Sequence, residues 1–328
     1  MRVATIGTSF ITEWFLKAVE GNPGVECVGI YSRKVETGQV IADKYNVNKV
    51  YTNLDEMLAI DEINFIYVAS PNSLHYEYTK MALLAGKNVI CEKPFTSNLK
   101  EAIELCALAK EKNLFLFEAI TTIHLPNYKL MKTKLDLLGK LKIVQCNFSQ
   151  YSSKYDKFLA GENPNVFTTK FSGGALMDIN IYNTHFIMGL FGKPRKVQYF
   201  ANIAENGIDT SGVLVFNYDH FLATAVGAKD SKSKCLAQIQ GEKGYIIVNS
   251  ETSRCKQIEI HLNNTSEVEV IELQDQEVAL TYEVADFKQI FDTNDYDLCY
   301  NKLQYSLSVM AVIDEAKHSA GIVFDSDK

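Results

Sequence analysis

The sequence predicts a two-domain α/β protein, with a doubly wound parallel sheet in its first part and a largely antiparallel sheet in its second. The chain of 328 residues is long for one hydrophobic core and sufficient for two. Up to about residue 122, short β-rich runs alternate with helical patterns, which is typical of βαβ units. Beyond it, several runs show partial apolar–polar alternation and are separated by tight turns. We therefore expect domains over residues 1–122 and 123–328.

The first domain is expected to alternate strands and helices. The β-rich runs predict strands over residues 2–7, 25–32, 63–70, 87–93 and 114–119. Helical patterns lie between them, over residues 11–21, 37–46, 54–60, 73–86 and 99–113. Asn98 and Glu101 resemble a capping pair that opens the last of these helices. Its expected apolar face carries Leu99, Ile103, Cys106 and Ala109.

The second domain is expected to begin with a helix over residues 128–139 and a strand over 142–152. A polar loop then runs through 154–174, before a helix over 175–192. Further strands are expected at 196–205, 211–218, 221–228, 235–241, 245–249, 257–262 and 267–273. Two helices close the chain; their apolar faces carry Val284, Phe287 and Phe291, and Leu303, Leu307, Met310 and Ile313.

Composition and charge exclude several classes of protein. The formal net charge is −7 and the lysines and arginines are scattered, so we expect no nucleic-acid partner. No apolar run approaches the roughly 20 residues of a membrane helix, and the chain enters a strand at once, without signal-peptide anatomy. The seven cysteines form no CxxC pair and have no zinc-ligand spacing. A reduced, cytoplasmic protein without a metal site is expected.

The first expected strand runs into Gly7 and is followed directly by a helix. In dinucleotide-binding folds the pyrophosphate lies at such a helix N-terminus, where free amides and the helix dipole attract an anion. The usual fingerprint is G-x-G-x-x-G, whereas this chain has Gly7, Ser9 and Thr12. An ordinary strand-to-helix turn would give the same pattern. If a dinucleotide binds, its phosphates are expected to contact Gly7, Ser9, Phe10 and Ile11.

The second expected strand ends in YSRK, where an NAD site would place an acid that holds the ribose 2′-hydroxyl. This chain has Ser32, Arg33 and Lys34 there instead. A carboxylate would repel a 2′-phosphate, whereas a hydroxyl and a guanidinium bind it. If a nucleotide binds here, NADP is therefore favoured over NAD, which stays possible. From these residues alone, a solvated basic turn is an equal alternative.

The run VICEKPF places Glu92 and Lys93 side by side, directly before Pro94. An unpaired charge in an apolar setting is costly, so the pair marks either a surface turn that closes an ordinary strand or a functional site. Ligands of parallel α/β sheets bind at the carboxyl edge of the strands, where this pair is expected to lie.

Residues 68–94 contain a longer spaced run of Pro-Asn, His, Ala-Gly-Lys and Glu-Lys-Pro. Its members are Pro71, Asn72, His75, Ala85, Gly86, Lys87, Glu92, Lys93 and Pro94. This run resembles the Gfo/Idh/MocA family of oxidoreductases. The stretches FLFEAI and GGALMDINIY are most similar to its branch of dimeric dihydrodiol dehydrogenases and NADP-dependent D-xylose dehydrogenases. The resemblance implies an N-terminal Rossmann domain and a C-terminal α/β domain with an open, mostly antiparallel sheet.

The resemblance also implies which side chains form the site. Lys93 is expected to reach into a cleft between the nicotinamide and the substrate. Further contacts to the cofactor are expected from Ser70, Pro71, Asn72, His75 and Glu92.

Oxidation of a carbinol needs a base, because hydride leaves the carbon only as the hydroxyl loses its proton. In the family branch a tyrosine does this, and Tyr182 occupies the matching place. The ammonium of Lys93 would stabilise its phenolate. Asp178, Tyr182 and His185 have the spacing i, i+4 and i+7, which shares one helix face. Asp178 is expected to orient a substrate hydroxyl or Lys93, while for Tyr182 and His185 a purely structural role is the alternative.

One departure from the branch concerns the residues after FEAI. An arginine is expected three residues on, but this chain has Ile123, followed by His124. A cation near the cofactor or substrate is therefore missing, and His124 is the candidate that replaces it in part. The expected substrate is a sugar, polyol or diol. The residues expected to bind it are Lys93, His124, Asp178, Tyr182 and His185.

Two other functions stay open at the level of the sequence. One is a non-catalytic regulatory protein of the same fold that binds NADP and a sugar, which the presence of Lys93 disfavours. The other is a Rossmann transferase with a different nucleotide, such as a methyl donor, which the basic residues at Arg33 disfavour. An open sheet leaves one face uncovered, so we expect a homodimer or a dimer of dimers. A monodisperse monomer in light scattering at micromolar concentration would refute this expectation.

Overall fold

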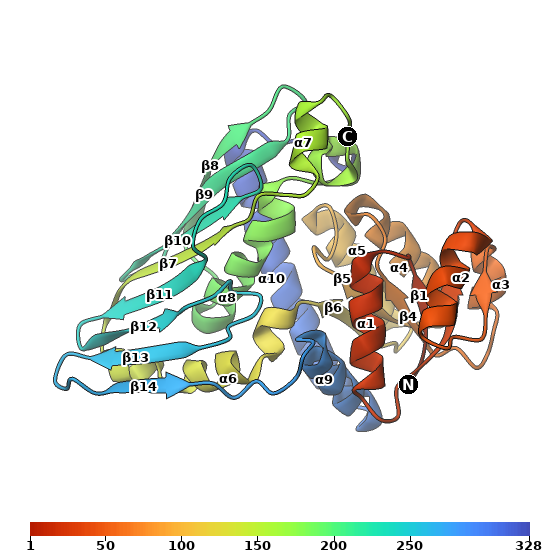
Figure 1. The fold of residues 1–328 in the computed structure, drawn as a ribbon, viewed down its shortest axis with the longest axis horizontal. Helices are drawn as coiled ribbons and strands as arrows, with labels where there is room; N and C mark the ends of the chain where they lie inside the picture. The colour runs from red at the N-terminus through yellow and green to blue at the C-terminus, as the bar shows by residue number, and fades with distance from the viewer. The chain divides into compact units, whose positions relative to one another are not determined.

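The computed structural model describes residues 1–328, and the chain forms two compact units. The first contains Met1–Ala119 and Gln276–Leu307, and the second contains Ile120–Asp275 and Ser308–Lys328. Figure 1 labels helices and strands of both units.

The first unit is built on a six-stranded sheet with the order β3-β2-β1-β4-β5-β6. All neighbouring strands are parallel. The strands are β1 (Arg2–Ile6), β2 (Glu26–Tyr31), β3 (Val50–Tyr51), β4 (Phe65–Val68), β5 (Asn88–Glu92) and β6 (Leu116–Ala119). This order is that of a dinucleotide-binding sheet, in which the direction of winding reverses between β1 and β4. The expected Rossmann domain is thereby confirmed, with the two-residue β3 as an addition.

Five helices connect these strands, where the sequence places helical patterns. They are α1 (Phe10–Glu20), α2 (Val35–Lys44), α3 (Leu54–Leu58), α4 (His75–Leu84) and α5 (Leu99–Glu111). The cap of α5 is confirmed, because Asn98 Oδ1 accepts the Glu101 amide at 3.0 Å and the Glu101 carboxylate accepts the Ser97 amide at 3.0 Å.

The apolar face predicted for α5 was wrong in part. Ile103 is 51% exposed, whereas the buried face consists of Ala102, Leu105, Cys106 and Ala109. The helix therefore buries two alanines, a cysteine and one leucine and leaves Ile103 at the surface.

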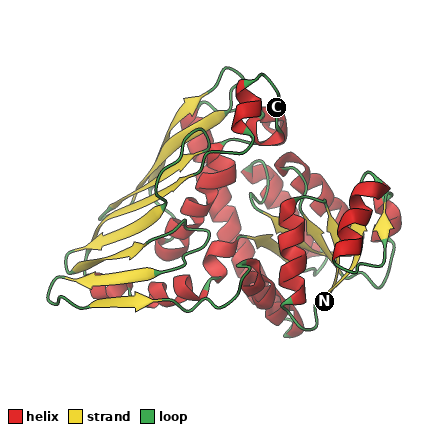
Figure 2. Ribbon diagram, viewed as in Figure 1, coloured by secondary structure: helices red, strands yellow, loops and turns green.

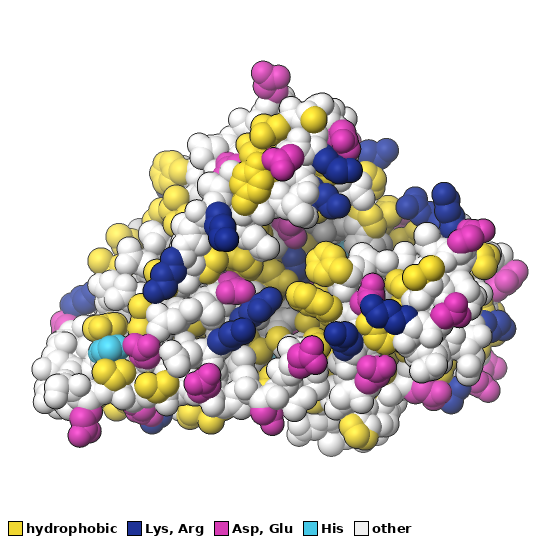
Figure 3. Space-filling view, viewed as in Figure 1, with side chains coloured by type: hydrophobic (Ala, Val, Ile, Leu, Met, Phe, Trp, Pro, Cys, Tyr) yellow, Lys and Arg dark blue, Asp and Glu magenta, His cyan; other side chains and the backbone are white.

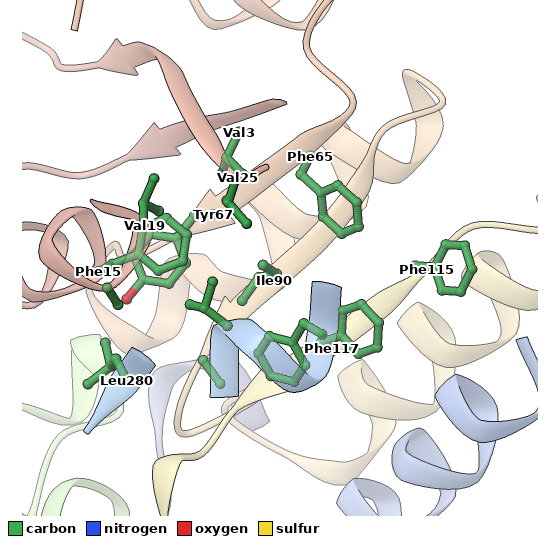
Figure 4. Packing of buried hydrophobic residues seen from close by; sticks show 14 of the residues in the cluster. Val3, Phe15, Val19, Val25, Phe65, Tyr67, Ile90, Phe115, Phe117 and Leu280 are labelled. Carbon is green, nitrogen blue, oxygen red and sulfur yellow. The ribbon is translucent and has the colours of Figure 1, made fainter. Parts of the chain in front are cut away.

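The C-terminal helices correct the expected domain boundary. Residues 276–307, which the sequence assigned to the second domain, belong to the first compact unit. They include α9 (Leu280–Asp292) and the first part of α10 (Tyr296–Ala320). The ring of Phe287 stacks on Phe117 with centroids 4.6 Å apart, and Figure 4 shows Leu280 near Phe15 and Tyr67. The apolar face of α9 thus completes the core of the Rossmann sheet.

The second unit is built on an eight-stranded sheet with the order β14-β13-β12-β11-β7-β10-β9-β8. Only β7 and β10 pair in parallel, so the expected mostly antiparallel sheet is confirmed. The strands are β7 (Leu141–Ser149), β8 (Lys196–Ile203), β9 (Asp209–Asn217), β10 (Leu222–Ala228), β11 (Leu236–Gly241), β12 (Gly244–Val248), β13 (Ile258–Leu262) and β14 (Val268–Ile271).

Helices of the second unit lie over one face of this sheet (Figure 2). They include α6 (Pro126–Thr133), α8 (Ile181–Phe191) and the end of α10. Along β8, buried and exposed side chains alternate, as expected for a sheet covered on one side. On the face drawn in Figure 3, basic and acidic side chains are mixed and form no continuous basic area. None of the helices combines the length and the apolar character that a membrane crossing requires.

The segment that the sequence assigned to a long loop contains a short helix, α7 (Tyr155–Leu159), and two 3-10 turns, Asn165–Phe167 and Thr169–Phe171. The reason is a local aromatic cluster. The rings of Phe158 and Phe167 stack with centroids 5.0 Å apart, and Tyr155 lies 5.6 Å from Phe167. Three aromatic side chains give this polar segment a small core of its own.

Candidate active site

The turn after β1 is shaped for a close approach of backbone atoms. Gly7 has φ +120°, and a Cβ on it would lie 2.4 Å from the carbonyl oxygen of Ala69, which follows β4. No other residue fits there, because the positive φ and the contact both exclude a side chain. The turn lies between β1 and β4, where the winding of the sheet reverses and where such folds bind dinucleotides.

Helix α1 begins directly after this turn, with Ser9 as its N-cap. The Ser9 hydroxyl makes no capping hydrogen bond, and both Ser9 and Phe10 are exposed. The first amides of an eleven-residue helix therefore point out of the turn without a capping side chain, which suits an anionic group. Ile11 is half-buried, and Thr12, at the place of the third glycine of the fingerprint, is fully buried. These residues fit the pyrophosphate of a dinucleotide; their contacts to it stay a prediction.

The turn after β2 keeps its basic side chains in solvent. Ser32 is buried, and its hydroxyl lies 2.7 Å from that of Thr37 and accepts the Lys34 amide at 3.4 Å. Arg33 and Lys34 are exposed. Ser32 thus connects the turn to the start of α2 through hydrogen bonds. The side chains of Arg33 and Lys34 remain in solvent, where they can bind an anion. This arrangement fits a ribose 2′-phosphate better than a free 2′-hydroxyl.

Glu92, the last residue of β5, is buried at the carboxyl edge of the sheet. It accepts a hydrogen bond from the hydroxyl of Tyr67, whose ring stacks on Phe15 at a centroid distance of 3.7 Å. Burial raises the pKa of Glu92 to about 7, against the opposing effects of the Tyr67 hydroxyl and the Lys93 ammonium. Lys93 follows, half-buried, with a cis peptide bond to Pro94. Because Glu92 is buried and Lys93 is half-buried, the Glu-Lys-Pro sequence is not an ordinary surface turn.

The ring of His75 is buried at the start of α4, and its predicted contact to the cofactor stays a prediction. Its Nδ1 lies 2.8 Å from the carbonyl oxygen of Pro94, and its Nε2 lies 3.0 Å from that of Ser70. Burial lowers the pKa of His75, which favours the neutral ring, and its single N–H donates to one of these two carbonyls. The imidazole therefore links the turn after β4 to the turn after β5 and positions the segment that carries Lys93. Pro71 and Asn72 lie in the sequence between Ser70 and His75.

The other candidate residues lie in the second unit, on a helix entered through Gly173 and Gly174. A Cβ on Gly173 would lie 2.6 Å from the backbone of Val166. Gly174 has φ +100°, and a Cβ on it would lie 1.9 Å from Oδ1 of Asp209. Asp209 is buried and accepts hydrogen bonds through Oδ2 from the Leu176 amide, at 2.7 Å, and from the Tyr199 hydroxyl, at 2.8 Å. The glycine pair thus lets the helix start against this carboxyl group.

The α-helical spacing expected for Asp178, Tyr182 and His185 was wrong for Asp178 only, because Tyr182 and His185 both lie in α8 (Ile181–Phe191). Residues Leu176–Asn180 form a π-helical turn, and α8 begins only at Ile181. The wider turn rotates Asp178 away from the α-helical register with Tyr182. Asn180 holds this turn on the sheet by donating to the Ala225 carbonyl at 2.9 Å.

Asp178 and Tyr182 are both partly exposed, as side chains that meet a substrate must be. His185 is fully buried in α8, which favours its structural alternative, and His124 is buried in the 3-10 turn Thr121–His124. The predicted contacts of these four side chains to a substrate stay predictions.

Sequence reasoning missed Lys229, which follows β10. Its ammonium forms an ion pair with Asp178, and its side chain is only 2% exposed. A signal was present, because the run ATAVGAKD ends an apolar strand in adjacent charges, as the run that ends in Glu92 and Lys93 does.

Family models match both parts of the chain. Residues 1–119 match the model described as "oxidoreductase family, NAD-binding Rossmann fold", and residues 133–247 match the GFO/IDH/MocA C-terminal domain. The uncharacterized oxidoreductase YgjR of Escherichia coli K12 is 36% identical over 327 residues, which cover 100% of this chain and 98% of that protein. The scyllo-inositol 2-dehydrogenase (NADP(+)) IolU of Bacillus subtilis 168 is 35% identical over 328 residues, covering 100% and 99%.

Solved structures agree with the fold. KijD10, a 3-ketoreductase from Actinomadura kijaniata in complex with NADP and TDP-benzene, superposes with a TM-score of 0.83 at 20% identity and 98% coverage of both chains. A levoglucosan dehydrogenase in complex with NADH and levoglucosan gives a TM-score of 0.82 at 16% identity, covering 98% of this chain and 97% of that one. At these identities the likeness shows the fold alone.

The sheet order, the turn at Gly7 and the matched family models define an NAD(P)-dependent oxidoreductase that acts on CH–OH groups. More particularly, the chain belongs to the Gfo/Idh/MocA family, as its sequence run predicted. The transferase alternative is thereby excluded.

The raised pKa of Glu92 predicts a pH-dependent stability. Because the folded protein binds this proton more tightly than the unfolded chain, with a pKa of about 7 against 4.5, the stability from this group is highest below pH 4.5. It falls as the pH rises to about 7 and then stays constant. Glu92→Gln is expected to remove this fall, which is on the order of 3 kcal/mol. Urea unfolding of both proteins at pH 5 and pH 8 measures it.

The exposed Glu62 provides the control, since Glu62→Gln is expected to leave the pH dependence as in the wild type. An equal loss of stability between pH 5 and pH 8 in the wild type and in Glu92→Gln would contradict the assignment.

Proposed function

We propose that this chain transfers hydride between NADP and a carbinol or carbonyl carbon of a sugar, polyol or diol, with Lys93 and Tyr182 handling the proton. The proposal rests mainly on the arrangement of Glu92 and His75 at the carboxyl edge of the Rossmann sheet. There Glu92 is buried and hydrogen-bonded, and His75 fixes the turn that presents Lys93.

The substrate class is supported by relatives. A protein named as a scyllo-inositol 2-dehydrogenase (NADP(+)) is 35% identical over the whole chain. Proteins named as trans-1,2-dihydrobenzene-1,2-diol dehydrogenases match over a smaller part, for example that of Xenopus tropicalis at 29% over 214 residues. All of these names describe the oxidation of a secondary hydroxyl group on a ring.

The protein must position the substrate and move one proton, while the nicotinamide, when bound, gives or takes the hydride. We assign to Tyr182 the removal of the proton from the substrate hydroxyl, with the positive charge of Lys93 stabilising the resulting oxygen anions. Asp178 is assigned a hydrogen bond to a second substrate hydroxyl, which suits a vicinal diol or polyol. In the direction of reduction the same groups return the proton to the carbonyl oxygen.

The preference for NADP is tested by titration with NADPH and with NADH, followed by nicotinamide fluorescence. Arg33→Ala is expected to weaken NADPH binding about tenfold or more and to leave NADH binding unchanged, because only NADPH carries the 2′-phosphate. Arg195→Ala, an exposed arginine of the second unit, is the control and should change neither. Equal binding of both cofactors by the wild type would refute the role of Arg33, and binding of neither would refute the dinucleotide site.

A screen of NADP-linked turnover with scyllo-inositol, other polyols, aldoses and trans-diols then tests the reaction. Turnover of none of these, by a protein that binds NADPH, would favour the non-catalytic regulatory alternative.

A homodimer formed through the open sheet is part of the proposal. Its support is the uncovered face of the second unit, where Phe200 of β8, Leu222 of β10 and Ile143 of β7 are 61%, 50% and 43% exposed. Exposed large apolar side chains on paired strands are typical of an interface between proteins. A cytoplasmic location is proposed as well, supported by seven cysteines that form no disulfide bond.

A further inference from the structure

Lys229 is a buried cation to which the reaction proposed above gives no role. We propose that Lys229 is a positioning residue for the substrate: it fixes the Asp178 carboxylate and holds the turn Asn165–Phe167 beside it. The inference rests on the proposed substrate contact of Asp178. All the groups involved belong to the second unit.

The backbone of Lys229 is tied at two points. Its amide donates to the Thr210 carbonyl of β9 at 2.8 Å, and its carbonyl accepts the amide of Ser152 at 2.9 Å. Lys229 therefore continues the sheet beyond the end of β10 (Leu222–Ala228), between two neighbouring chain segments. A side chain that starts from so fixed a backbone presents its ammonium at a defined place.

The ammonium meets three groups there. It forms the ion pair with Oδ2 of Asp178, lies 3.4 Å from the carbonyl oxygen of Val166, and sits over the ring of Phe167 at 4.8 Å from its centroid. Burial of an ammonium group is costly even when it is paired, and an apolar side chain of similar size is often as stable. A buried ammonium with these partners is thus better explained by placement of Asp178 than by stability.

The Val166 carbonyl connects the two elements that Lys229 touches. It also accepts the amide of Gly174 at 3.0 Å, directly before the π-helical turn that carries Asp178. This oxygen therefore links the 3-10 turn to Gly174, two residues before the π-helical turn, and the Lys229 ammonium lies next to it. Loss of the ammonium is expected to loosen both turns together, because it removes one partner of each.

The test compares Lys229→Met with Lys317→Met, a matched control in the same unit. Lys317 is equally buried, and its ammonium pairs with Asp314 at 3.1 Å and Asp327 at 3.2 Å. Lys229→Met is expected to raise the KM of the best polyol or diol substrate about tenfold or more, with a smaller change in kcat and an unchanged Kd for NADPH. Lys317→Met is expected to lower stability and leave the KM unchanged.

A double mutant separates positioning from general damage. If Lys229 acts through Asp178, the KM of Lys229→Met with Asp178→Asn should equal that of Asp178→Asn alone. Additive effects, an unchanged KM in Lys229→Met, or an equal rise in Lys317→Met would each overturn the inference.

Amide hydrogen exchange tests the role of Lys229 without a measurement of enzyme activity. In Lys229→Met the amides of residues 165–180 should exchange faster than in the wild type and in Lys317→Met. If no sugar, polyol or diol is turned over, the proposed reaction is refuted; if Asp178→Asn leaves the KM unchanged, the proposed substrate contact of Asp178 is refuted. In both cases the exchange rates still decide whether Lys229 holds the two turns. Equal exchange in all three proteins would overturn this.

Discussion

Replacing Lys93 with alanine is expected to lower kcat by about 10³-fold while leaving the Kd for NADPH within a few-fold of the wild type. General acid–base and charge-stabilising groups contribute about 10²- to 10⁴-fold to such reactions. Lys93 follows the buried Glu92, and its turn is held by the ring of His75 through the Pro94 carbonyl. Its charge is therefore placed at the sheet edge at which dinucleotides bind. Steady-state rates on the best substrate of the screen, with NADPH titrations beside them, measure both quantities.

Lys87 provides the matched control for this prediction. It precedes β5 at the opposite end of the strand, is buried, and donates to the Ile60 carbonyl at 2.7 Å. Lys87→Ala is expected to reduce stability and leave kcat unchanged. A Lys93→Ala enzyme that retains more than about a tenth of the wild-type kcat would show that the proton is handled elsewhere.

Replacing Gly174 with alanine is expected to destabilise the protein by about 4 kcal/mol or more, among the larger effects of single substitutions. The new Cβ would lie 1.9 Å from Oδ1 of Asp209, at a residue with φ +100°. Asp209 cannot move away at low cost, because it is fully buried and bonded to the Leu176 amide and the Tyr199 hydroxyl. Calorimetry should show a Tm lower by roughly 10 °C.

Gly161 separates the contact from the backbone conformation. It lies in the same unit with φ +83°, and a Cβ on it would meet no atom within 4 Å. Gly161→Ala therefore carries only the cost of a left-handed residue, about 1 to 2 kcal/mol. Similar losses of Tm in the two variants would mean that the Asp209 carboxyl group yields easily and does not fix the start of the π-helical turn.

Local sequence patterns predicted most of the helices and strands of the first unit. The alternation of apolar runs and helical patterns predicted five of its six strands and all five connecting helices, because each βαβ unit is formed by residues close in the sequence. The two-residue β3 has too few residues to show a period. Helix α9 was assigned to the wrong unit, since an apolar face shows that a helix is covered but not by which sheet.

For the candidate site, too, some features were predicted from the sequence and others are shown only by the tertiary structure. From the sequence alone came the Rossmann class, the mostly antiparallel second sheet, and the family, which short motifs around Pro71, Glu92 and Lys93 identify. Only the tertiary structure shows that the ring of His75 lies between two backbone carbonyls, that Asp178 lies in a π-helical turn, and that Lys229 pairs with it. The physical reason is separation along the chain. Asp178 and Lys229 are 51 residues apart, and their contact depends on how β10 and the π-helical turn Leu176–Asn180 pack, which no local period encodes.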